Sequence, residues 1–268
     1  MEAAGLGLFM MSAGLFTTLV EYPGSPLHPL FESAFVRRAL IGLAMGGTAI
    51  ALIYSPWGQQ SGAHYNPAVT LTFFRLGKVR PWDAVFYIAA QFVGGAAGVL
   101  VTSAMLQERF QQPPVSYVAT LPGPFGPSVA FLAETIISFT MMGMVLTVSN
   151  TKLLARYTGL FAGALVFAFI TLEGPLSGMS MNPARSVSSA APARAWRGLW
   201  IYLSAPVLGM FMAAEANRWI RGPHAVLCAK LNHQTTRRCI FCCSRTSGLL
   251  LAVVALALCR DMGLEVHV

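Results

Sequence analysis

The sequence predicts an all-α membrane protein with six transmembrane helices and two re-entrant half-helices, arranged as an inverted repeat. Three observations predict this fold. The 268-residue chain is 55% hydrophobic and only 10% charged, whereas soluble domains carry about 25% charged residues. Six apolar segments are each long enough to cross a bilayer, and an eight-residue motif occurs twice. A duplicated motif in such an apolar chain indicates two homologous halves.

The spanning segments follow from length and hydrophobicity. A helix needs roughly 20 apolar residues to cross about 30 Å of hydrocarbon. Six segments satisfy this requirement, and prolines interrupt several of the connections between them. We expect the helices near residues 3–21, 35–55, 82–106, 128–149, 157–174 and 198–219.

Two further apolar pieces, near 67–76 and 183–191, are too short to cross the membrane, and each follows an Asn-Pro pair. We expect them to be half-helices that end at the middle of the bilayer. Each half then contributes an odd number of spanning helices, so the second half must be inverted relative to the first. The predicted channel domain covers 1–220, with a first repeat at about 1–106 and a second at about 128–219.

The duplicated motif runs from Ser61 to Ala68 and again from Ser177 to Ala184. Asparagine is a favoured N-cap and proline suits the first helical position, so each copy can begin a helix. A single Asn-Pro-Ala is usually an ordinary helix cap. Two copies, each with Ser-Gly ahead of it and apolar helices on either side, favour a shared site at the bilayer centre. The residues of the two triplets are Asn66, Pro67, Ala68, Asn182, Pro183 and Ala184.

Two asparagine caps that meet at the bilayer centre would direct their amide donors and two positive helix ends into one cavity. A water molecule there would accept from both asparagines, and the chain of proton-conducting hydrogen bonds would be interrupted. Backbone N–H and C=O groups outside a helix at this depth need hydrogen-bond partners within the protein. Glu2 and Glu134, near the starts of the two halves, are expected to accept hydrogen bonds from loop N–H groups.

These features resemble the major intrinsic protein family, the aquaporins and glycerol facilitators. The resemblance covers about 1–219 and rests on SGAHYNPAV, SGMSMNPARS, the two glutamates, Gln91 in AAQFVGG and the helix spacing. It implies the aquaporin-like fold, a pore in each subunit and a homotetramer. It also implies structural support from His64 and from Gln91, for which we expect pairing with loop backbone.

The same resemblance implies an outer constriction, or selectivity filter. Arg185 follows the second triplet at the position of the family's constriction arginine, and Met179 and Ile170 match two further positions. The second-helix position is ambiguous between Gly46 and Met45. The histidine and phenylalanine typical of water-selective members are absent at these positions, so the filter is expected to be more apolar than a strict water filter.

The predicted function is a passive channel for water, with small neutral solutes such as glycerol as further candidates, that excludes protons and ions. The alternative is a structural membrane-contact protein whose bulky Met179 and Ile170 close the pore. An ion channel is disfavoured by Arg185 and the two positive helix ends. No nucleophile, metal cluster or phosphate loop indicates an enzyme, and we expect no metal, cofactor or nucleic acid. The distribution of Lys and Arg favours cytoplasmic termini, in a multi-pass protein of the plasma membrane.

The tail, 221–268, differs in character from the rest of the chain. It is basic and holds all the cysteines: Cys228, Cys239, Cys242, Cys243 and Cys259. No credible fourth ligand accompanies a zinc site, and the apolar run near its end is too short to span. We expect the tail to be interfacial or disordered, and mercurials not to block at the pore mouth, because no cysteine is expected near the pore.

Overall fold

The computed structural model describes residues 1–233, 235, 240 and 241. Within this part of the chain, six helices are long and apolar enough to cross a membrane. Their bounds agree with the expected segments to within a few residues. They are α1 (Glu2–Glu21), α2 (Ala34–Tyr54), α5 (Pro81–Leu106), α7 (Pro127–Val148), α8 (Thr158–Leu172) with the preceding turn from Ala155, and α11 (Leu199–Arg221).

The two expected half-helices are α4 (Pro67–Arg75) and α10 (Pro183–Ala193), each with proline at its first position. Each is preceded by a short helix that the sequence did not predict. These are α3 (Pro56–Ser61) and α9 (Gly174–Ser177), and each ends at a glycine in the left-handed region. The connections also contain η1 (His28–Leu30), α6 (Glu108–Gln111), η2 (Ser116–Val118) and η3 (Ala155–Tyr157).

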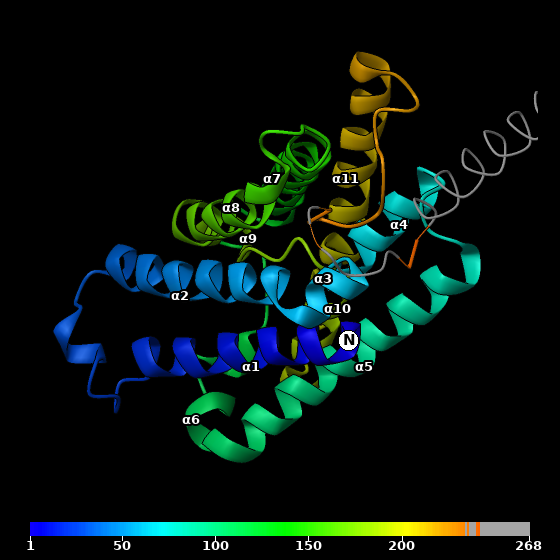
Figure 1. The fold of residues 1–268 in the computed structure, drawn as a ribbon. Coiled ribbons are helices and arrows are strands. Elements are labelled where there is room, and N and C mark those ends of the chain that lie inside the picture. Colours follow the sequence, from blue (N-terminus) through cyan, green and yellow to red (C-terminus); the bar gives the residue numbers. More distant parts are fainter. Residues whose placement is uncertain (234, 236–239, 242–268) are drawn as a thin grey trace, which may run out of the picture.

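The helices pack as two related halves. Helix α1 lies against α5 in the first half, as α7 lies against α11 in the second, and α2 packs against α8 across the two halves (Figure 1). Each half-helix contacts the last helix of the other half, α4 with α11 and α10 with α5. The half-helices therefore lie between the halves, and the paired loops that precede them are brought to the centre of the bundle.

Small residues allow the close helix contacts. A Cβ atom added to Gly94 of α5 would collide with the backbone of Ala3 on α1, and one added to Gly98 would collide with that of Gly7. Across the two halves, a Cβ atom on Gly46 of α2 would collide with the carbonyl of Gly163 on α8. Helices in lipid associate largely by such van der Waals packing, so these glycines set the spacing of the bundle.

The described part of the tail departs from the interfacial or disordered segment that we expected. After α11 ends, the chain turns at Gly222 and runs back toward α3 and α4 (the orange segment in Figure 1). Val226, Cys228, Ala229 and Leu231 are buried there. This part of the tail therefore packs on the channel body, while Cys239, Cys242, Cys243, Cys259 and the final apolar run lie outside the described residues.

Replacing Gly94 by alanine is expected to destabilise the bundle by about 1–3 kcal/mol, because the added methyl must push α1 and α5 apart. The measurement is thermal unfolding of the purified protein in detergent. Gly143→Ala on α7 is the matched control, because a Cβ atom there meets nothing within 4 Å. Equal unfolding temperatures for the two variants would contradict this account of the α1–α5 contact.

Candidate functional site

Glu2 holds the loop that precedes α4. Its Oε1 accepts from the Ser61 hydroxyl at 2.7 Å and the His64 N–H at 3.3 Å, and its Oε2 accepts from the Tyr65 N–H at 2.6 Å. The Glu2 side chain is buried. One carboxylate thus supplies acceptors for backbone donors that have no helical partner, which would otherwise be costly to bury.

Glu134 of α7 does the same for the loop that precedes α10. Its Oε1 accepts from the Ser177 hydroxyl at 2.8 Å and the Ser180 N–H at 2.7 Å, and its Oε2 accepts from the Met181 N–H at 2.8 Å. The two carboxylates bind equivalent positions of the two motif copies. The repeat in the sequence is therefore a repeat of hydrogen bonds in the structure.

The two loops share a strained backbone. Both contain residues in the left-handed region, where a residue with a side chain costs roughly 1–2 kcal/mol. The positive φ angles fall at matching positions: Gly62, Ala63 and Tyr65 in the first loop and Gly178, Met179 and Met181 in the second. The hydrogen bonds to the glutamates offset this cost and hold the backbone in a shape that neither helix nor strand provides.

Two tyrosines brace the same loops, and the sequence analysis did not identify this role. The Tyr87 hydroxyl of α5 donates to the Ser61 carbonyl at 2.7 Å, and the Tyr202 hydroxyl of α11 donates to the Ser177 carbonyl at 2.6 Å. One feature of the sequence could have indicated this role: each tyrosine lies on the last spanning helix of its half.

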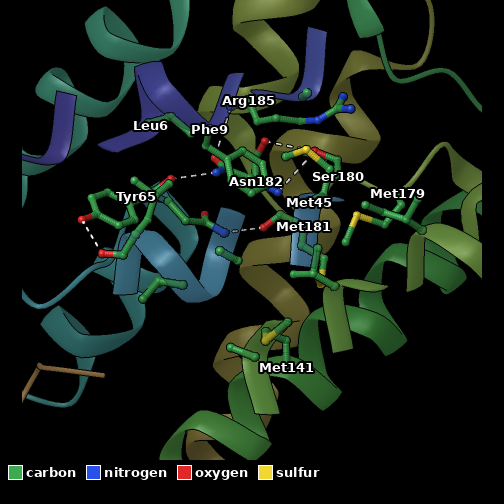
Figure 2. A pocket seen from close by; sticks show the side chains of 18 of the residues that line it. Leu6, Phe9, Met45, Tyr65, Met141, Met179, Ser180, Met181, Asn182 and Arg185 are labelled. Atoms are coloured by element: carbon green, nitrogen blue, oxygen red, sulfur yellow. Dashed lines mark hydrogen bonds between the residues drawn. The ribbon is translucent and has the colours of Figure 1, made fainter. Parts of the chain in front are cut away.

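Asn66 and Asn182 cap the half-helices and also bind each other's loops. Asn66 Oδ1 accepts from the Ala68 N–H at 2.9 Å, and Asn182 Oδ1 accepts from the N–H groups of Ala184 and Arg185 at 3.1 and 3.2 Å. Asn66 Nδ2 donates to the Met181 carbonyl at 2.7 Å, and Asn182 Nδ2 donates to the Tyr65 carbonyl at 2.8 Å (Figure 2).

This crossed pair corrects one detail of the sequence analysis. There, both amide hydrogens of each asparagine were expected to face the cavity. One hydrogen of each is instead bound to the opposite loop, so each asparagine keeps one further donor. The crossed bonds also join the two halves at the point where the half-helices begin.

A cavity of about 350 Å³ runs along these loops. Both asparagines line it, together with Arg185, Met179 and Ile170. Figure 2 shows Asn182, Arg185 and Met179 among the lining side chains. Residues of the first loop, including Ala63 and His64, line it as well. The cavity therefore connects the region of the second-loop residues with the region of the first-loop residues, past the paired asparagines.

The structure distinguishes the two candidates on α2. Met45 is buried and lines the cavity, and the Ser12 hydroxyl lies 3.7 Å from its sulfur. Gly46 packs against the backbone of Gly163 on α8 and is not among the residues that line the cavity. Of the two alternatives that the sequence left open, the cavity lining therefore favours Met45, because the missing side chain of Gly46 serves helix contact.

Arg185 reaches into the cavity from the second position after the proline of α10 (Figure 2). Its Nη1 atom is buried and has no hydrogen-bond partner in the described part of the chain. The rest of its surroundings in the cavity is largely apolar, with Met45, Ile170 and Met179 among the lining side chains. An unpaired buried guanidinium nitrogen beside a cavity can donate to a molecule that occupies it.

His64 and Gln91 lie on the first-loop side. The His64 ring stands 3.1 Å from the Thr70 hydroxyl through Nδ1 and 2.7 Å from the Ala229 carbonyl through Nε2. Gln91 Nε2 donates to Glu2 Oε2 at 2.7 Å and to the Thr70 hydroxyl at 3.1 Å. The expectation that Gln91 pairs with loop backbone is therefore wrong: it supports the loop indirectly, by binding the carboxylate that holds it.

Comparisons with known proteins agree with this geometry. The model of the family described as "Major intrinsic protein" matches residues 8–216. Aquaporin NIP6-1 of Arabidopsis thaliana is 38% identical over 77% of this chain and 67% of its own length. Aquaporin NIP2-3 of Zea mays is 36% identical over 85% of this chain and 75% of its own. The X-ray structure of the aquaglyceroporin from Plasmodium falciparum superposes with a TM-score of 0.67 at 18% identity, covering 84% of this chain and 96% of that one.

Glu134→Gln is expected to lower the free energy of unfolding by about 1–3 kcal/mol, because the amide offers one oxygen where the carboxylate offers two and a buried donor loses its partner. Thermal unfolding in detergent measures this. Glu173→Gln is the control, since both carboxylate oxygens of the buried Glu173 lack a hydrogen-bond partner in the described part of the chain. A loss as large in the control would argue against a specific role for Glu134.

Proposed function

The chain belongs to the major intrinsic protein family, and on that premise we propose that it is a passive channel that admits water and excludes protons and ions. The observation that carries the proposal is the meeting of the Asn66 and Asn182 side chains in one cavity between two half-helix N-termini. Two of the relatives are named aquaporins. No enzymatic step is needed for this function.

The crossed asparagines would orient the central water molecule. Each side chain keeps one amide hydrogen after bonding to the opposite loop, and the half-helices direct their positive ends to the same point. A water molecule between them accepts two hydrogen bonds and donates to its neighbours on both sides. It cannot also accept from a neighbouring water, so proton transfer along the file stops there.

The outer end of the passage would select the solute. Arg185 provides a fixed positive charge and a free donor, whereas Met45, Ile170 and Met179 provide apolar walls. Such a constriction replaces few of the hydrogen bonds that a hydrated ion would lose, and its charge repels cations. We therefore propose water as the main substrate and small neutral solutes such as glycerol as further substrates.

We further propose that the protein is a homotetramer in the plasma membrane with both termini in the cytoplasm. Large apolar side chains on the outer surfaces of several spanning helices are exposed, as lipid or a second copy would require. Examples are Leu43 on α2, Val93 on α5 and Leu132 on α7. The basic residues at the end of α11 fit the cytoplasmic side.

Reconstituted protein tests the channel function directly. Proteoliposomes exposed to a sucrose gradient should shrink faster in stopped-flow light scattering than empty liposomes, and a glycerol gradient should then show re-swelling if glycerol passes. Shrinkage at the rate of empty liposomes would contradict the proposal and favour a structural role in the membrane.

Arg185→Val is expected to increase proton leak by up to about 100-fold while water still passes. The reason is electrostatic. At an effective dielectric constant of about 20, the charge of the arginine raises the energy of a cation about 5 Å away by about 3 kcal/mol. Liposomes loaded with a pH-sensitive dye measure the leak. Arg197→Val is the matched control, because Arg197 is exposed and does not line the cavity. An unchanged leak in Arg185→Val would show that the arginine is not the barrier.

A further inference from the structure

The segment Val226–Asn232, here called the strap, crosses one end of the cavity. Helix α11 ends at Arg221, Gly222 turns the chain with a φ of 88°, and the segment then runs back toward α3 and α4 (Figure 1). The end that it reaches is the mouth formed by the first loop, at Gly62, Ala63 and His64. We call this the inner mouth.

The strap is attached to both halves of the bundle. The Leu227 N–H donates to Asn150 Oδ1 at 2.7 Å, just after the end of α7 in the second half. The Leu231 N–H donates to the Gly62 carbonyl at 3.1 Å, in the first loop. Between these two points, the Ala229 carbonyl accepts from His64 Nε2 at 2.7 Å. The bonds thus join the strap to Asn150 of the second half and to Gly62 and His64 of the first.

The strap is buried in a way that a loose tail is not. Ala229 is fully buried, and Leu231 is 6% exposed, whereas Leu227 is 63% exposed. The Phe241 ring lies parallel to the His64 ring, with centroids 5.6 Å apart. An added Cβ atom at Gly62 would come within 2.9 Å of the Phe241 ring and 3.1 Å of the Ala229 carbonyl. The first loop and the strap are therefore in direct contact.

One strap residue enters the passage itself. Leu231 lines the same cavity as Asn66, Val69 and Ala63. Its side chain is apolar and cannot donate or accept a hydrogen bond. A water molecule beside it therefore has fewer hydrogen-bond partners than one beside the polar loop backbone. Hydrophobic constrictions of this kind can close a pore by excluding water.

We propose that the strap is a built-in gate that closes the inner mouth, with Leu231 as its plug, and that release of the strap opens the channel. The proposal rests on the channel function proposed above. The two ends of the passage then have separate tasks: the outer end with Arg185 selects the solute, and the inner end with Leu231 sets how much passes.

The first test compares Leu231→Ala with Leu227→Ala in proteoliposomes of equal protein content. Leu231→Ala removes the plug and should raise the osmotic water permeability several-fold, whereas Leu227→Ala changes an exposed strap residue of the same type and should leave it unchanged. Equal permeability of Leu231→Ala and the unaltered protein would overturn the proposal. A similar increase in both variants would also overturn it, because the effect would not be specific to the residue in the passage.

A second readout reports whether the strap is docked. Cys228 is 3% exposed, and burial raises the pKa of its thiol, so it should react slowly with maleimide. In a background with Cys239, Cys242, Cys243 and Cys259 replaced by serine, Leu231→Asp should release the strap and accelerate labelling of Cys228 by at least tenfold. The same variant should raise water permeability. Faster labelling with unchanged permeability would make the strap a brace rather than a gate, and unchanged labelling in a variant with raised permeability would overturn release as the cause.

The two proposals fail in different ways. If the unaltered protein and the released variant conduct water equally well, the channel function stands and the gate is excluded. If neither conducts, the channel function is excluded and the gate with it. Flux in the unaltered protein that exceeds that of empty liposomes and rises several-fold after release would support both.

Discussion

The structure depends on satisfying non-helical backbone in the middle of a membrane. Two loops enter the bundle and present N–H groups that no helix pairs, and lipid offers them no partner. Glu2 and Glu134 solve this in the same way, each accepting from two backbone N–H groups and one serine hydroxyl. The carboxylates come from α1 and α7, the first helices of the two halves. The position of these helices therefore fixes the loops, and the loops fix where the half-helices begin.

The asparagines of these supported loops also join the two halves. Each one caps its own half-helix with its oxygen and binds the opposite loop with its nitrogen. The Asn66 side chain makes two hydrogen bonds and the Asn182 side chain makes three, so the direction of the remaining donor on each is set before any water arrives. Such preorganised donors act without reorganisation cost at the moment a molecule passes. A loop held only by solvent could not orient them in this way.

The sequence predicted the parts of the fold that depend on local pattern. Helix positions followed from hydrophobic length, and the half-helices from Asn-Pro, because capping and proline geometry are local properties. Gly46, Gln91 and the tail were not predicted, since each depends on what lies across the bundle. Gly46 faces α8, Gln91 reaches Glu2 rather than backbone, and the strap returns to His64. Cys228 consequently lies beside the inner mouth, where the sequence analysis had placed no cysteine.

The two loops differ at the position whose side chain holds the strap. His64 in the first motif corresponds to Ser180 in the second. The Ser180 hydroxyl bonds to Ser186 and to the Asn182 carbonyl, which lie within its own loop and half-helix. The longer His64 ring uses one nitrogen for Thr70 of its own half-helix and has a second nitrogen that reaches Ala229 outside the repeat. A serine at this position has no second group with that reach. The departure from symmetry in the motif is therefore what gives the first loop, and not the second, a side-chain attachment point for the chain beyond α11.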